Sequence, residues 1–120
     1  MADREAVVEQ AFRILKPGGR LLLCHHDFDG VIITGKNREL TRRLVHGFAD
    51  HSQEWQEVAE GRMGRMIPGL LARADFASVE IETRMFVDLD LAEGSYAGDY
   101  VGWLVDLAPA LGIDANEARN

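Results

Sequence analysis

Apolar side chains recur at helical spacing in four stretches of the chain, and most of these stretches carry a start or stop signal. In the first, residues 3–15, Asp3 is a suitable N-cap and the Lys-Pro-Gly-Gly run that follows ends the helix. The second stretch follows Asn37, the third begins near Gly61, and the fourth covers residues 92–111. The pattern therefore predicts four amphipathic helices.

Two further stretches carry the patterns of β-strands. Residues 20–25 form a short, nearly continuous apolar run, which is typical of a strand covered by helices on both faces. Residues 78–88 alternate instead, with apolar side chains mainly at odd positions and charged ones mainly at even positions, as in a half-exposed strand near a sheet edge. Helices alternating with strands predict an α/β fold.

This α/β domain is expected to be incomplete, because two strands rarely make a stable sheet alone. Asp114 has the character of an N-cap for one more helix, but only a few residues follow it. The sequence therefore predicts that residues 1–120 are a single partial domain of something larger. A chain whose sheet lacks its centre is expected to form a homodimer or to bind a separate chain that supplies the missing part.

Composition narrows the classes of function. The chain has 20 acidic and 13 basic residues and a net charge of −7, which argues against binding to nucleic acid. No apolar run approaches the roughly 20 residues of a membrane span. The basic residues gather in the middle third, as solvated helix faces or as an anion-binding surface. The single Cys24 cannot form an internal disulfide, so a buried, reduced thiol in a cytoplasmic protein is expected.

Two sequence motifs resemble class I S-adenosylmethionine-dependent methyltransferases. Residues 7–23 read VVEQAFRILKPGGRLLL and are similar to the family's RVLKPGGRLLL segment, between its fourth helix and fifth strand. Residues 70–81, LLARADFASVEI, resemble the LLxxAGFxxVxVE segment that leads into its sixth strand. The resemblance spans the C-terminal half of small-molecule methyltransferases of the quinone and polyketide type. It implies a truncated Rossmann-like methyltransferase fold without the half that carries the glycine loop.

The cofactor half of that family is missing from the sequence. No GxGxG loop follows a strand, and the Pro-Gly-Gly run at 17–19 precedes one instead, so no residue is predicted to bind a cofactor. S-adenosylmethionine is implied by the resemblance alone and is not expected to bind tightly to this chain. The function implied is a methyltransferase fragment that acts on a small organic molecule and is not competent alone. The alternative is a non-catalytic binding or dimerisation module.

The candidate site follows the first predicted strand, because ligands of open α/β sheets bind beyond the C-terminal ends of strands. His25 and His26 are candidate general bases, since an imidazole titrates near neutral pH. Four other residues are candidates for binding substrate: Asp27, Asp29, Trp55 and Met63. The alternative is that the loop is ordinary and polar, and that the aromatic and methionine side chains pack a core or an interface. No spacing typical of a metal site appears.

Overall fold

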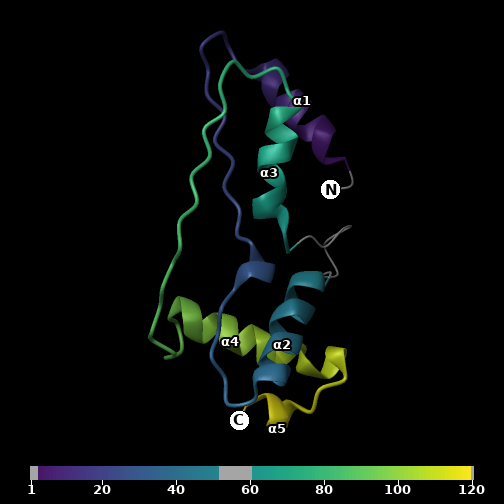
Figure 1. The fold of residues 1–120 in the computed structure, drawn as a ribbon, viewed down its shortest axis with the longest axis vertical. Helices are drawn as coiled ribbons and strands as arrows, with labels where there is room; N and C mark the ends of the chain where they lie inside the picture. The colour runs from purple at the N-terminus through teal and green to yellow at the C-terminus, as the bar shows by residue number, and fades with distance from the viewer. Residues whose placement is uncertain (1–2, 52–60, 120) are drawn as a thin grey trace.

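The computed structural model describes residues 3–51 and 61–119, and its regular elements are all helical (Figure 1). Within these residues, five elements are α-helices and two are short 3-10 helices, labelled η. The elements in chain order are α1 (Arg4–Ile14), η1 (Phe28–Gly30), α2 (Arg38–Asp50), α3 (Met63–Ala72), α4 (Tyr96–Leu107), η2 (Ala108–Leu111) and α5 (Ala115–Ala118).

Local capping explains where the helices begin. The Asp3 carboxylate accepts from the Ala6 N–H at 2.9 Å, and the Asn37 amide oxygen accepts from the Leu40 N–H at 3.1 Å. Asp114 caps α5 in the same way. These three predicted caps are confirmed, because each depends only on residues within one turn. In α3 the helix continues through Pro68 rather than ending there.

The main hydrophobic core lies between α2 and α4. Side chains from both helices meet there, and η2, α5 and the loop around η1 close the sides (Figure 1). The buried members are Leu40, Leu44, Val45, Tyr100, Leu104, Ala108 and Ile113. Gly47 allows α2 to approach η2 closely, since a Cβ on that glycine would lie 2.4 Å from a methyl carbon of Leu111.

A second, smaller body consists of α1 packed on α3, at the other end of the molecule in Figure 1. Val8 is the buried residue of α1 and Leu70 that of α3. The Phe12 and Phe76 rings meet edge to face, with centroids 5.1 Å apart, and Arg73 lies 3.0 Å from a Glu5 carboxylate oxygen. This pair therefore encloses little apolar surface of its own.

The prediction of an α/β, truncated Rossmann-like fold is wrong, because the described part of the chain contains helices and no strand. Residues 20–25 and 78–88 are extended, but no backbone hydrogen bond joins the two segments within the described part. A β-strand forms only when its backbone hydrogen-bonds to a neighbouring strand. Alternation of apolar and charged residues favours an extended conformation, but it does not provide that neighbouring strand. The two segments consequently lie open as long connections.

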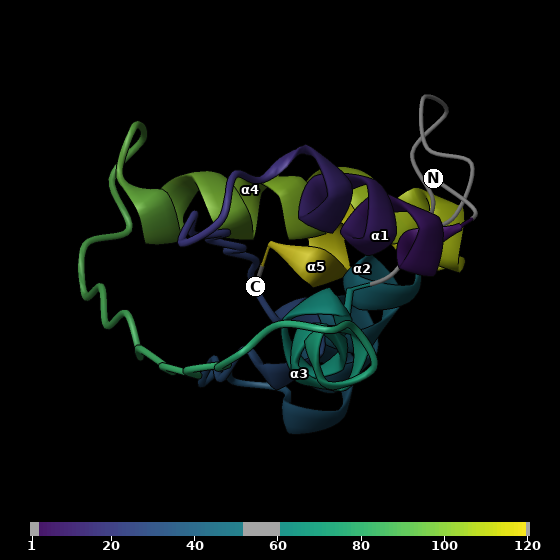
Figure 2. The same ribbon diagram turned by 90° about the horizontal axis from the view of Figure 1, so that it is seen from above.

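The molecule is elongated as a result. Its extents are 55 × 29 × 24 Å and its radius of gyration is 17.5 Å, against roughly 14 Å expected for a compact domain of this length. Residues 78–91 run along the outside between the small body and the start of α4 (Figures 1 and 2). Among the described residues, no helix is long and apolar enough to cross a membrane.

Candidate functional site

The loop at residues 25–30 connects the two bodies. The Phe28 N–H donates to the Gly61 carbonyl at 2.7 Å, and the Asp27 carboxylate accepts from the Gly30 N–H at 3.1 Å, which starts η1. Gly64 lies against the same loop, since a Cβ there would sit 3.3 Å from the His25 carbonyl oxygen. The loop is thus held between the start of α3 and the core.

Arg65 of α3 fixes the loop by two carboxylates. Its guanidinium donates to both oxygens of Asp27, at 2.6 Å from Nε and 2.7 Å from Nη2, and Nη1 lies 3.3 Å from Asp29. The hydrogen bond from Arg65 holds the pKa of Asp27 below its ordinary value, and the same contact raises the pKa of Arg65. We call Asp27, Asp29 and Arg65 the loop clamp.

The two candidate histidines are exposed and lie beside aromatic rings. The His26 ring centroid is 5.4 Å from that of Phe28 and 5.9 Å from that of Tyr96, in tilted arrangements. The His25 Nδ1 lies within hydrogen-bond distance of the His26 carbonyl, which can only accept, so this nitrogen carries the proton. His26 therefore presents its imidazole on an aromatic surface, whereas His25 uses one nitrogen within the loop.

The other candidates are placed differently. Asp27 and Asp29 share Arg65, so both carboxylates already contact a cation of the same chain. Met63 is the half-buried first residue of α3, two positions before Arg65. Trp55 lies outside the described residues. The substrate-binding roles of these residues stay predictions.

Sequence reasoning missed Arg65. It lies 38 positions from Asp27, and the sequence analysis counted it only among the basic residues of the middle third. No short-range motif marks a pairing between a loop and the first turn of a distant helix, so no signal in the sequence could have singled it out. Cys24, expected to be buried, is exposed, because the sheet that was to contain its strand between covering helices does not form.

The aromatic surface continues inward as a chain of ring contacts. Phe28 stacks on Tyr100 with centroids 6.2 Å apart, and Phe48 meets Tyr100 edge to face at 5.2 Å. Trp103 extends the group outward and is half exposed. This aromatic cluster, formed by His26, Phe28, Phe48, Tyr96, Tyr100 and Trp103, leads from solvent at His26 to the core.

The Tyr100 hydroxyl is an anomaly within the aromatic cluster. The residue is 4% exposed, and its hydroxyl oxygen has no hydrogen-bond partner among the residues that the structure describes. Burial raises the pKa of Tyr100 to about 12. A buried hydroxyl without a partner costs free energy, because its hydrogen bonds to water are lost and not replaced. Tyr100 is therefore held by packing of its ring and not by its polar end.

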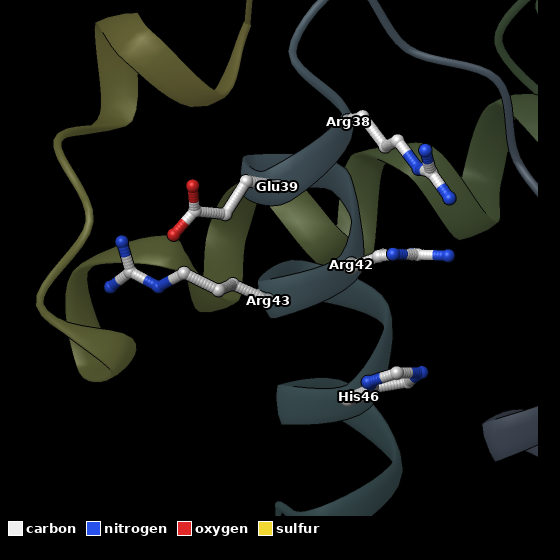
Figure 3. A pocket seen from close by; sticks show the side chains of 5 residues that line it. All are labelled: Arg38, Glu39, Arg42, Arg43 and His46. Carbon is white, nitrogen blue, oxygen red and sulfur yellow. The ribbon is translucent and has the colours of Figure 1, made fainter.

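A different surface lies on the solvent side of α2, around a shallow, open hollow (Figure 3). Arg38, Arg42 and His46 follow one another at intervals of four residues and point the same way, while Glu39 and Arg43 lie on the other side of the helix. All five side chains are exposed. The solvated-face and anion-binding interpretations of these basic residues both remain open.

Comparison with protein-family models, curated proteins and solved structures finds no match for this chain. Among the described residues, no group of three or more His, Cys, Asp and Glu side chains could hold a metal ion.

Proposed function

We propose that the chain is an assembly module that binds a second copy of itself by strand pairing along residues 78–91. One observation carries this proposal. These fourteen residues form no helix or strand, no backbone–backbone hydrogen bond within the described chain pairs them with another segment, and a row of apolar side chains faces solvent. Only near the end of the segment do Asp88 and Asp90 accept hydrogen bonds from Ala97 and Ser95 at the start of α4. An exposed, extended and alternating segment is a template for pairing with another chain.

The exposed fractions of the side chains in this row show how much apolar surface an interface could bury. Its larger members are Ile81, 64% exposed, Met85, 82%, Val87, 69%, Leu89, 91%, and Leu91, 68%. Fully burying one such side chain contributes roughly 1.5–3 kcal/mol. Soluble monomers rarely leave a contiguous apolar row of this kind uncovered. Covering the row would therefore stabilise the molecule by several kilocalories per mole, on the order of the burial of a few such side chains.

A second copy is the occupant that matches the surface best. The two longest segments without helix in the described part of the chain are residues 19–27 and 78–91, and both display apolar side chains to solvent, among them Leu22 at 84% exposure. An identical copy brings both kinds of segment at once. In a two-fold symmetric dimer, both segments of each chain can then be paired. No unpaired segment is left to which further copies could add.

Sedimentation velocity at low micromolar concentration tests the proposal. We expect a dimer of the 13.4 kDa chain, with slowed hydrogen exchange at the amides of residues 78–91. Met85→Glu should shift the dimer to monomer, because it places a charge in the apolar row. Ile32→Glu is the matched control, since Ile32 is 85% exposed but lies outside both segments. A well-folded monomer in the unsubstituted chain would overturn the proposal.

A second candidate function is methyl transfer to a small organic molecule, as the resemblance to class I methyltransferases implies. The observation that favours it is the exposed imidazole of His26, supported by Phe28 and Tyr96 beside a clamped loop. Such a histidine can take a proton from a hydroxyl while a flat substrate lies on the aromatic surface. Residues other than these 120 would have to hold S-adenosylmethionine, because this sequence has no glycine loop.

Calorimetry with S-adenosylmethionine tests whether this chain alone holds the cofactor, which neither candidate expects because the sequence has no glycine loop. The assembly module should give no heat of binding alone, whether or not it dimerises. Tight binding by the pure chain would require a cofactor site within these 120 residues and would favour methyl transfer without a second polypeptide. If a partner restores activity, His26→Ala should lower it while His46→Ala, on the exposed face of α2, leaves it unchanged. We also propose a cytoplasmic location, supported by the free, exposed Cys24, because such thiols persist in reducing compartments.

A further inference from the structure

We propose that residues 78–91 of one copy pair, antiparallel, with residues 20–26 of the second copy, in a register that sets Arg20 opposite Asp88. This inference rests on the proposed self-assembly and adds the partner segment, the direction and the register. Three properties of the chain lead to it: the direction of the two segments, their charges and the order of their side chains.

The direction follows from the fold. Residues 19–27 and 78–91 both run from the end of the molecule that holds the turn after α1 toward the end that holds α4 (Figure 1). A two-fold axis perpendicular to this direction reverses both segments in the second copy. Each segment of one copy then meets the other kind of segment running the opposite way, so symmetry favours two antiparallel ladders.

The charges distinguish the two possible partners of residues 78–91. This segment contains four acidic residues and one arginine, whereas Arg20 is the only Lys, Arg, Asp or Glu residue between positions 20 and 26. Pairing with the basic segment is therefore attractive, and pairing of the acidic segment with its own copy is repulsive overall. Self-pairing would also leave the apolar side chains of residues 21–23 uncovered.

The order of side chains selects the register. With Arg20 opposite Asp88, the opposed pairs that follow are Leu21 with Val87, Leu22 with Phe86, Leu23 with Met85, Cys24 with Arg84, His25 with Thr83, and His26 with Glu82. Three apolar pairs lie between the pair of opposite charge, Arg20 with Asp88, and the polar pair of His26 with Glu82. Shifting the register by two residues in either direction places the apolar Leu22 opposite the charged Asp88 or Arg84, which is unfavourable. Shifting it by one residue turns the side chains of one strand to the opposite face of the ladder.

Native Cys24 allows a direct test. In this register Cys24 faces Arg84 of the second copy, and directly opposed residues of antiparallel strands have Cα atoms about 4.5–5.5 Å apart, within the range of a disulfide. We therefore expect Arg84→Cys, under mild oxidation, to form an intermolecular disulfide with Cys24 that peptide mapping identifies. Arg84 is 83% exposed at its side chain, so the substitution should not disturb folding.

Two matched variants make the test specific. Glu82→Cys lies on the same face as Arg84 but diagonal to Cys24, at about 7–8 Å, so it should cross-link much less. Thr83→Cys with Cys24→Ser reports the rival arrangement, because self-pairing of residues 78–88 centred on Thr83 would link that cysteine to its own copy. Preferential cross-linking in either variant would overturn the register.

The outcomes also separate this inference from the proposed function. A dimer in sedimentation without a Cys24 link to position 84 would overturn the pairing and leave self-assembly standing. A folded monomer would overturn both. A disulfide between Cys24 and position 84 within one chain would also overturn the pairing, because it would place the two segments together without a second copy.

Discussion

The two bodies of the molecule have similar helices but very different surroundings. Between α2 and α4, seven buried residues form one cluster with partly buried neighbours around it. Between α1 and α3, each helix buries one residue, and the segments that leave this pair lie open to solvent. Helix formation alone therefore does not produce a core, because a stripe of apolar residues is stabilised only by the surface that covers it.

Truncating one buried leucine to alanine in each body is the strongest test of the difference in packing between them. Leu104→Ala removes a side chain that is 4% exposed within the cluster of α2 and α4, and we expect it to lower the free energy of unfolding by about 2–5 kcal/mol. Leu70→Ala, in α3, removes a side chain that is 8% exposed. Its effect should be clearly smaller, because the thin contact of α1 and α3 can collapse around the gap.

Urea denaturation followed by circular dichroism measures both variants. If Leu70→Ala destabilised the chain as much as Leu104→Ala, the two bodies would be equally well packed and the contrast would be wrong. Loss of α1 and α3 in a separate transition at lower urea would sharpen it, since that result would show two units of unequal stability.

A substitution that strengthens the better-packed body is also expected. Tyr100→Phe keeps the ring contacts with Phe28 and Phe48 but removes a buried hydroxyl that finds no partner in residues 3–51 and 61–119. The free energy of unfolding should rise by about 1–3 kcal/mol. Tyr96→Phe is the control, because Tyr96 is 44% exposed and its hydroxyl can reach water. A loss of stability in Tyr100→Phe would mean that the hydroxyl has a partner in solution.

The same hydroxyl gives stability a dependence on alkaline pH. The pKa of Tyr100 is raised from 10.0 to about 12 in the folded chain, so folding favours the protonated form. Its contribution is fully present below pH 10, decreases as the unfolded chain ionises, and is lost as the pH rises through about 12. Tyr100→Phe should remove this decrease, which a series of thermal melts at increasing pH would detect.

The sequence predicts those features of the two bodies that depend on residues close together in the chain, and fails for those that depend on distant segments. Asp3, Asn37 and Asp114 were predicted as caps because each bonds within its own helix. The strand predictions at residues 20–25 and 78–88 failed because pairing depends on a distant segment that alternation does not specify. The pattern of residues 78–88 was read correctly as alternation and wrongly as a sheet.

The candidate site likewise has one feature that the local sequence predicts and several contacts that it does not. The polar loop at His25–Asp29 was singled out from its place after an apolar run, and the structure retains it as a clamped connection without the sheet. Its fixation by Arg65 and its contact with Tyr96 join segments 38 and 70 positions apart. Such contacts arise from the packing of whole elements, so single-sequence patterns do not contain them.

A smaller effect is expected from the helix caps, which differ between the bodies in what they support. Asn37→Ala removes the cap of α2, which lies at the centre of the core, and should lower the free energy of unfolding by about 1 kcal/mol. Asp3→Ala removes the equivalent cap of α1. We expect it to fray α1 locally with little effect on the main transition, because α1 contributes one buried residue.

Hydrogen exchange together with urea denaturation distinguishes these results. Asp3→Ala should speed exchange in the first turn of α1 and leave the midpoint of the main transition in place. An equal shift of that midpoint by both substitutions would show that α1 unfolds together with the core, contrary to the contrast drawn between the bodies.

The smallest change in stability, and the most local one, should follow from opening the loop clamp that joins the bodies. Arg65→Gln removes the bidentate contact with Asp27 and the contact with Asp29, and exposed pairs of this kind contribute little to global stability. Exchange at the amides of residues 26–30 should become faster while the melting of the core stays the same. Arg73→Gln is the matched control, because its partner Glu5 lies within the small body.

Acid should open the same clamp in the unsubstituted chain. Arg65 lowers the pKa of Asp27 below 3.8, so the stabilisation is present above that pH and is lost as the pH falls through the folded value. Faster exchange at residues 26–30 below pH 3.8, absent in Arg65→Gln because its loop is already open, would place the clamp at the junction. Exchange that responds equally to Arg73→Gln would show instead that the two bodies are joined elsewhere.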